Sequence, residues 1–220
     1  MMVIFVASCD KNADLFEPFH HCLEKYWTKH PKVVYCTETV KNPYYKTINK
    51  DYPLEQWTRR IRESLEEVKD DLVLFMVDDI FIRKQVDEKR IKYISGLFGD
   101  FGSLALVNLE KEWDDNEEIG LDRLKRRPKG KMFRISLMCG VWDRKKLIDI
   151  LEGDHDPWFV ENSQPCKDYE YYINSGDYII DWGYKTFCEV GVFKGKWCKE
   201  VVPFFEAEGL EIDYEKRGFN

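Results

Sequence analysis

Two adjacent acids, Asp78 and Asp79, directly follow six consecutive apolar residues at positions 72–77. Such a run is typical of a strand buried on both faces of a sheet, and ligands of open α/β sheets bind beyond the carboxyl ends of strands. Two neighbouring carboxylates repel each other, whereas a divalent cation completed by substrate phosphates and water offsets that repulsion. We therefore expect Mg²⁺ or Mn²⁺ here, assisting the departure of a nucleoside diphosphate. The pair alone leaves two alternatives open, because adjacent acids also cap helices and form ion pairs.

The elements that position these acids alternate between strands and helices, as in an α/β chain. Short apolar runs predict strands at 3–7, 33–36, 72–77 and 104–107, and strict alternation predicts a half-buried strand at 133–139. Apolar residues at helical spacing predict helices around 15–27, 57–68, 90–98, 143–151 and 201–208. We also expect loops over 41–53 and 110–130, a short helix near 168–174 and a late strand at 187–193.

The length and composition of the chain exclude several classes of protein. With 220 residues, 44% of them hydrophobic, we expect one domain with a substantial core rather than a disordered chain. The formal net charge of −7 argues against a general nucleic-acid binder, which needs a basic face. No apolar run approaches the roughly 20 residues that span a bilayer, and no basic stretch precedes the first short apolar run. We therefore expect a cytoplasmic location.

The seven cysteines are scattered and form no Cys-x-x-Cys pair. A zinc site using His20, His21 and Cys22 is one interpretation of this pattern. The interpretation that we favour is reduced thiols that act as small core residues in a reducing compartment.

Several motifs in a fixed order resemble a group of bacterial GT-A-type glycosyltransferases of surface-polysaccharide biosynthesis. In that group a helix with Trp and Arg, here Trp57-Thr-Arg-Arg60, precedes a strand ending in Asp-Asp-x-Phe, here Asp78-Asp-Ile-Phe81. The second half of the chain is similar in Gly140-Val-Trp142, Pro157-Trp-Phe-Val-Glu161 and the tail from Gly195-Lys-Trp197 to Phe219. The likeness implies one GT-A-like, Rossmann-type α/β sandwich over 1–220, with a mixed, mostly parallel central sheet flanked by helices. Many GT-A enzymes carry Asp-x-Asp, whereas the acids are adjacent here.

The resemblance implies roles for residues of a donor site. Ser8, Asp10 and Asn12 would lie beside the nucleoside, and Glu38 would face the base or ribose. Arg60 would lie near the donor pocket, Asp78 would contact the ribose or sugar, and Asp79 would hold the metal. Each position also has a plainer interpretation: Ser8 and Asp10 as caps of the following turn, Arg60 as a surface ion-pair residue, and Glu38 as a solvated loop acid.

The resemblance also implies an acceptor site. Glu161 would be the general base that deprotonates an acceptor hydroxyl, which favours inversion at the sugar, although Asp154, His155, Asp156 and Asp168 are nearby candidates. Trp142 and Trp158 would offer flat faces to sugar rings, or belong to the core. The basic segment 123–131 is either a solvated loop or a contact for the donor diphosphate or a lipid phosphate at a membrane surface.

The expected function is transfer of a sugar from a nucleotide-sugar donor to a saccharide or lipid-linked acceptor, with no nucleic-acid partner. A nucleotidyltransferase is one alternative, but such enzymes normally carry a glycine-rich phosphate loop after the first strand, and residues 8–12 contain no glycine. The other alternative is a catalytically inactive protein that keeps the fold and binds a nucleotide or saccharide.

Overall fold

The centre of the molecule is one mixed sheet in the order β3-β2-β1-β4-β8-β5-β9-β7-β6, and the computed structural model describes residues 1–112, 115–131, 133–163, 167–183 and 191–220. Only β7 and β8 run opposite to the other strands of this sheet, so the predicted mostly parallel α/β class is confirmed. The strands are β1 (Met2–Ala7), β2 (Val33–Thr37), β3 (Lys46–Asn49), β4 (Leu72–Val77), β5 (Leu104–Lys111), β6 (Glu117–Leu121), β7 (Leu124–Arg126), β8 (Cys139–Asp143) and β9 (Glu170–Asn174).

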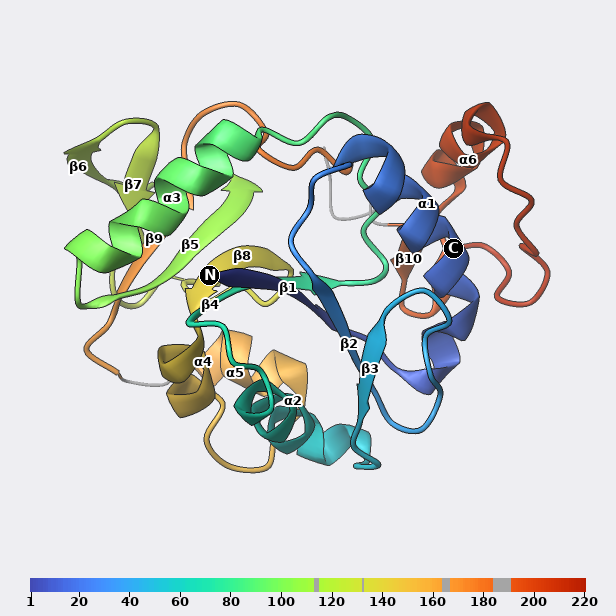
Figure 1. Ribbon diagram of the computed structural model, residues 1–220, viewed down its shortest axis with the longest axis horizontal. Helices are drawn as coiled ribbons and strands as arrows, with labels where there is room; N and C mark the ends of the chain where they lie inside the picture. Colours follow the sequence, from blue (N-terminus) through green and yellow to red (C-terminus); the bar gives the residue numbers. More distant parts are fainter. Residues whose placement is uncertain (113–114, 132, 164–166, 184–190) are drawn as a thin grey trace.

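Helices cover both faces of the sheet (Figure 1). One face packs against α1 (Phe16–Tyr26), α3 (Glu88–Asp100) and α6 (Val202–Glu208), and the other against α2 (Trp57–Glu66), α4 (Arg144–Ile150) and α5 (Pro157–Ser163). The longer helices α1, α2 and α3 form here because each has an apolar stripe at helical spacing, such as Trp57, Ile61 and Leu65 in α2. Burying one such side chain contributes about 1.5–3 kcal/mol.

The parallel pairing of β1 and β4 sets the position of the predicted site. The register runs from Met2 opposite Leu72 to Ala7 opposite Val77. Ser8 and Asp78 follow these two strands directly, so both residues lie at the same end of the sheet. The strand at 72–77 was predicted with its observed bounds, because six consecutive apolar residues suit a central strand buried on both faces.

Three sequence predictions of local structure are wrong. Segment 41–53 was expected to be a loop but contains β3, an edge strand, and segment 110–130 contains the β6–β7 hairpin. The segment 168–174, expected to be a helix, contains strand β9. This strand pairs with β5 on one side and β7 on the other, and its side chains at 171–174 are buried. Each of these strands is short, and pairing with a neighbour rather than a local periodicity stabilises it.

Two further strand predictions had wrong or untested bounds. The strand expected at 133–139 begins only at Cys139 as β8 and continues to Asp143, and residues 133–138 form turns and bends before it. Most of the strand expected at 187–193 lies outside the described residues, which include 191–193 with β10 (Val192–Phe193). β10 pairs with β11 (Lys196–Trp197) in a small separate hairpin.

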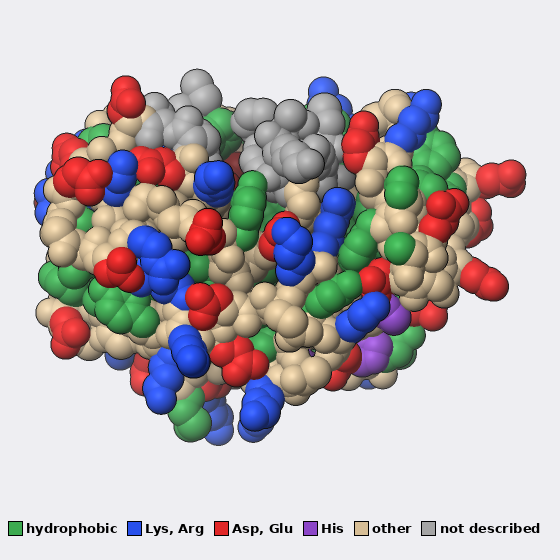
Figure 2. Space-filling view, turned by 90° about the horizontal axis from the view of Figure 1, so that it is seen from above, with side chains coloured by type: hydrophobic (Ala, Val, Ile, Leu, Met, Phe, Trp, Pro, Cys, Tyr) green, Lys and Arg blue, Asp and Glu red, His purple; other side chains and the backbone are tan. Residues whose placement is uncertain are grey.

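The surface and the thiols agree with a well-packed α/β protein. Cys22, Cys36 and Cys139 are buried free thiols, as expected, whereas Cys166 and Cys188 lie outside the described residues. Acidic and basic side chains are intermixed over the face that carries α1 and α3 (Figure 2). None of the described helices combines the length and apolar character needed to cross a bilayer.

Candidate functional site

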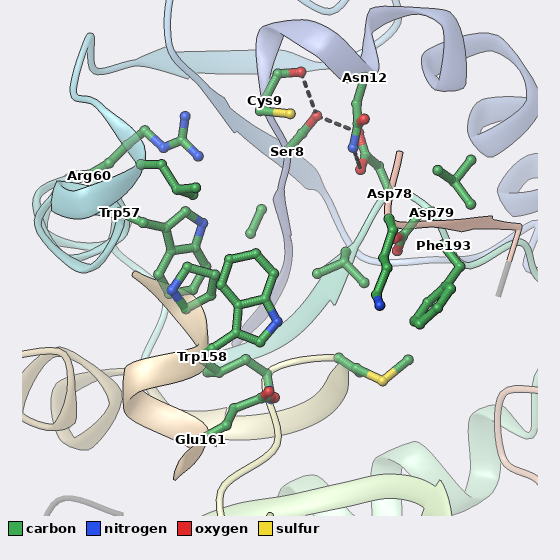
Figure 3. Close-up of a pocket in the computed structure, with 18 residues that line it drawn as sticks. Ser8, Cys9, Asn12, Trp57, Arg60, Asp78, Asp79, Trp158, Glu161 and Phe193 are labelled. Carbon is green, nitrogen blue, oxygen red and sulfur yellow. Dashed lines mark hydrogen bonds between the residues drawn. The ribbon is translucent and has the colours of Figure 1, made fainter. Parts of the chain in front are cut away.

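A cavity of about 560 Å³ opens at the carboxyl ends of β1 and β4 (Figure 3). One side, here called the β1–β4 wall, consists of Ala7, Ser8, Cys9, Asn12, Arg60, Val77, Asp78 and Asp79. The opposite side, here called the α5 wall, consists of Leu137, Met138, Pro157, Trp158 and Glu161. Val192, Phe193 and Lys194 of the β10–β11 hairpin complete the lining, together with Leu54 and Trp57 beside Arg60.

Asp78 lies at the base of the β1–β4 wall with only 1% of its surface exposed. Its two carboxylate oxygens accept hydrogen bonds from the Ser8 hydroxyl and from Asn12 Nδ2, the latter at 2.8 Å. Burial and the neighbouring Asp79 charge raise the pKa of Asp78 to about 7, against the lowering effect of the two hydrogen bonds. The side chain is therefore held rigidly in one orientation, and its charge is costly unless a cation or further donors approach.

Asp79, the second acid of the pair, also lines the cavity. Its Oδ1 atom is enclosed and has no hydrogen-bond partner among the described residues. Burial raises the pKa of Asp79 to about 6. An enclosed carboxylate oxygen without a partner suits a hard divalent cation such as Mg²⁺ or Mn²⁺.

The protein alone offers few ligands for such a cation. No group of three or more His, Cys, Asp or Glu side chains suited to a metal occurs within the described residues. A cation at Asp79 would therefore take most of its ligands from substrate phosphates and water, which is the usual arrangement for Mg²⁺ at phosphate sites.

An ion pair between buried Arg60 and half-buried Glu38 connects the loops after β1 and β2 to α2. Arg60 is 3% exposed, lines the cavity and pairs with Glu38. Glu38 in turn accepts a 2.6 Å hydrogen bond from the backbone of Asp10, and the Asp10 carboxylate accepts from the backbone of Thr39 at 2.9 Å. Of these predicted donor residues, Arg60 reaches the cavity, whereas Asp10 and Glu38 lie behind its wall and connect the two loops.

Trp142 and Trp158, which were both predicted to bind the acceptor, lie in different environments. Trp158 is 59% exposed and lines the cavity, whereas Trp142 is fully buried in β8. A buried indole presents no face to a sugar ring, so the structure does not support an acceptor-binding role for Trp142. Alternation along β8 turns this side chain into the core between the sheet and α4.

Glu161 is the acid near α5 that lines the cavity. It accepts a 2.8 Å hydrogen bond from the backbone of Leu137, and burial raises its pKa. The other candidate bases are engaged elsewhere: Asp156 accepts from the backbone of Phe159, Asp154 from Gln56, and Asp168 pairs with Lys129. His155 stacks on Phe159.

A second buried acid, Glu110 at the end of β5, lies behind the α5 wall. The Ser136 hydroxyl donates to its carboxylate at 2.6 Å. Burial raises the pKa of Glu110 to about 7, against the hydrogen bond from Ser136, and the charge of Glu161 adds to the increase. Glu110 and Glu161 thus hold the segment 136–138 from two sides, and Leu137 and Met138 of this segment line the cavity. Sequence reasoning missed Glu110 because it ended this strand at residue 107 and assigned Glu110 to a charged loop over 110–130, whereas β5 continues to Lys111.

The basic segment 123–131 lies apart from the cavity lining. Lys125 pairs with Glu112 and Glu118, and Arg126 pairs with Glu117 and Glu170. These ion pairs hold the charges of the β6–β7 hairpin, which agrees with the interpretation of the segment as a solvated part of the surface.

The sheet order and the cavity define the Rossmann-like α/β fold shared by nucleotidyltransferases and GT-A-type glycosyltransferases. The sequence matches no protein-family model and no curated protein. Solved structures with a similar fold include CMP:2-keto-3-deoxy-manno-octonic acid synthetase complexed with CTP, a nucleotidyl transferase from Methanothermobacter thermautotroptrophicus, and TarS 1-349 of S. aureus.

These likenesses cover most of the chain at low identity. The synthetase is 9% identical over 94% of this chain and 97% of its own, with a TM-score of 0.51. The nucleotidyl transferase is 11% identical over 94% and 97%, with a TM-score of 0.50. TarS 1-349 is 11% identical with a TM-score of 0.51, and the match spans 81% of this chain but 59% of that fragment. At such identities the comparison establishes the fold alone.

Proposed function

We propose that this protein is a glycosyltransferase that moves a sugar from a nucleotide-sugar donor to a saccharide or lipid-linked acceptor in surface-polysaccharide synthesis. The observation that supports it most is one cavity with Asp78 and Asp79 on one wall and Glu161 on the other (Figure 3). Inverting transfer needs both a charge partner for the leaving diphosphate and a base for the acceptor hydroxyl, at opposite sides of the reacting carbon.

The β1–β4 wall would bind the donor. Asp79 would hold a Mg²⁺ or Mn²⁺ ion, which supplies positive charge to the leaving diphosphate when bound. Asp78, held by Ser8 and Asn12, would accept a hydrogen bond from a ribose or sugar hydroxyl. Arg60 Nε is buried and has no hydrogen-bond partner within the described part of the chain, so it would be available to an acceptor atom of the nucleotide.

The α5 wall would bind the acceptor. Glu161 would take the proton of the attacking hydroxyl, and its raised pKa makes it a stronger base than an exposed glutamate. Trp158 would stack on the acceptor sugar with its exposed indole face. Attack from the wall opposite the diphosphate inverts the configuration of the transferred sugar.

Nucleotidyl transfer is the second candidate. It is favoured by the likeness to a synthetase complexed with CTP over nearly the whole length of both chains. The loop after β1 argues against it, because residues 8–12 lack the glycines that let a backbone cradle a triphosphate. The two reactions release different products, so they can be separated directly.

The test measures binding first and products second. Calorimetry with UDP-, GDP- and dTDP-sugars and with CTP, each with Mn²⁺, identifies the nucleotide that binds. Mass spectrometry then follows each bound donor in the presence of candidate acceptors. Sugar transfer releases a nucleoside diphosphate, whereas nucleotidyl transfer releases pyrophosphate.

Each outcome selects one function. Acceptor-dependent release of a nucleoside diphosphate supports the proposal. Pyrophosphate release identifies a nucleotidyltransferase, and binding without turnover identifies an inactive nucleotide-binding protein. Absence of binding by every nucleotide and nucleotide sugar would refute the proposal.

A further inference from the structure

The C-terminal segment returns to the loop that follows β1, far from it in sequence. Gly209, in the left-handed conformation at φ 71°, ends α6 and turns the chain back. Trp197 of β11 and Phe219 form an isolated parallel β-bridge, and the backbone N–H of Trp197 donates a 3.0 Å hydrogen bond to the Gly218 carbonyl. Asn220 Nδ2 donates to the Phe193 carbonyl at 2.7 Å, which fastens the tail to the hairpin that lines the cavity.

This arrangement places Arg217 against the loop that carries Asn12. The Arg217 side chain is only 8% exposed. Its Nε donates to Asp14 at 2.7 Å, and its Nη2 donates to the Lys11 carbonyl at 2.8 Å and to Asn12 Oδ1 at 3.1 Å. A guanidinium offers such a fixed fork of donors, which a lysine cannot reproduce.

The contact with Arg217 determines which way the Asn12 amide faces. A guanidinium only donates hydrogen bonds, so it must meet the amide oxygen of Asn12. The amide nitrogen then points the other way and donates to Asp78 at 2.8 Å. With the amide reversed, Nδ2 would meet the guanidinium and Oδ1 would meet the Asp78 carboxylate, and both contacts would be repulsive.

We propose that Arg217 is a positioning residue of the donor site, which fixes the Asn12 amide so that it donates to Asp78. The C-terminal segment is thus part of the functional site although it contributes nothing to the cavity lining. Its role in donor binding rests on the proposed function, whereas the orientation of the Asn12 amide can be measured without any ligand.

The first test is spectroscopic and uses the full chain. Nuclear magnetic resonance of the asparagine side-chain amides, with Asn12→Ala for assignment, follows the Asn12 NH₂ group in the wild type, Arg217→Ala and Arg217→Lys. We expect one strongly downfield, exchange-protected Asn12 proton in the wild type, and its return to the free-amide range in Arg217→Ala. An Asn12 signal unchanged in Arg217→Ala would overturn the proposal.

The matched control is Lys216→Ala, which removes the same charge from the adjacent residue of the tail. Lys216 is 56% exposed and lies 4.0 Å from Asp14, so its loss leaves the Asn12 contact intact. We expect the Asn12 signal to stay at its wild-type position in Lys216→Ala. If Arg217→Ala fails to fold, Arg217→Lys tests the proposal instead, because lysine keeps the positive charge but lacks the paired N–H donors of the guanidinium. A wild-type Asn12 signal in Arg217→Lys would overturn the proposal.

The second test measures binding of UDP, GDP and CTP with Mn²⁺ by calorimetry. Loss of a residue that orients a ligand-binding group typically weakens binding about 10–100-fold, so we expect this loss in Arg217→Ala, partial recovery with free guanidinium, and less than about a twofold change in Lys216→Ala. Equal weakening in both variants would mean that only charge matters and would refute the positioning role. If the wild type binds no nucleotide, the proposed function fails while the spectroscopic result still stands.

Discussion

The two walls of the cavity differ in how firmly their side chains are held. On the β1–β4 wall, Asp78 is buried and accepts two hydrogen bonds, and Arg60 is buried in an ion pair. On the α5 wall, Trp158 is 59% exposed, and one backbone hydrogen bond holds Glu161. A preorganised wall loses little freedom when a ligand binds, whereas an open one adapts to ligands of different shape. Under the proposed function, the first wall would bind the same nucleotide in every reaction, and the second would accept acceptors of different shape.

The largest effect is expected from Asp79→Asn on the β1–β4 wall. The substitution keeps the shape but removes the charge that would hold the cation, so we expect turnover of the donor to fall by about 10²–10⁴-fold. Its melting temperature should stay the same or rise, because one of two adjacent buried acids is gone. Donor turnover by mass spectrometry and thermal melting check this, with exposed Asp154→Asn as the control. Full activity in Asp79→Asn would mean that the β1–β4 wall does not carry the reaction.

The next largest effect concerns the free energy of unfolding, which should fall in a variant of Trp142 but not in a variant of Trp158. Trp142→Ala removes a fully buried indole, and large-to-small changes of this kind cost about 3–5 kcal/mol of the free energy of unfolding. Trp158→Ala changes an exposed side chain and should stay within about 0.5 kcal/mol of the wild type. Urea unfolding of both variants measures the difference. Equal losses would mean that Trp158 belongs to the core.

A pH effect tests the buried acid behind the α5 wall. The pKa of Glu110 is about 7 in the folded protein, against 4.5 for an ordinary glutamate such as the unfolded chain presents. The folded protein therefore binds the extra proton between these values, so Glu110 lowers the free energy of unfolding as pH rises from 4.5 to 7. Glu110→Gln should remove this decrease and gain up to about 3 kcal/mol over the wild type above pH 7.

Urea unfolding at pH 4.5 and pH 8 measures this gain, since the difference between the two proteins should grow with pH. Ser136, Arg127, Glu161 and Asn108 surround the Glu110 carboxyl and remain in both proteins. A difference that is the same at both pH values would mean that Glu110 ionises normally in the folded state.

The smallest effect is expected for acceptor binding at Trp158. Loss of an exposed stacking platform should raise the acceptor KM by about tenfold in Trp158→Ala, with kcat nearly unchanged. Phe159→Ala is the matched control, because Phe159 is also an exposed aromatic of α5 but stacks on His155 outside the cavity lining. Steady-state kinetics with a fixed donor give both constants. A fall in kcat instead of a rise in KM would place Trp158 against the reacting atoms.

The parts of the fold that could be predicted are those with a strong local pattern. The run at 72–77 and the helical spacing of Trp57, Ile61 and Leu65 gave β4 and α2 nearly as observed. Strand β3 was missed because its four residues lie in a segment rich in turn-forming residues. Strand β9 was interpreted as a short helix although Tyr171, Tyr172 and Ile173 favour strands, and its pairing with β5 and β7 defines it. The predicted α/β class was still correct, since it depends on the elements with the clearest sequence patterns.

The site residues that could be predicted are those whose side-chain chemistry and place at the end of an element both indicate a function. Asp78 and Asp79 followed from acids at a strand end, and the resemblance pointed to Arg60, Trp158 and Glu161, all of which line the cavity. The resemblance could not separate Trp142 from Trp158, because a similar motif does not reveal which face of a strand is covered. Nor could it separate Arg60, on the wall, from Asp10 and Glu38 behind it.

From the sequence alone one can place a central strand and its terminal acids, because burial on both faces and the charge at the strand end are local properties. Only the tertiary structure decides which side chains meet. Parallel pairing of β1 with β4 brings Ser8 to Asp78, and the returning tail brings Arg217 to Asn12, 205 residues away. Such contacts depend on the packing of distant segments, and no local pattern encodes them.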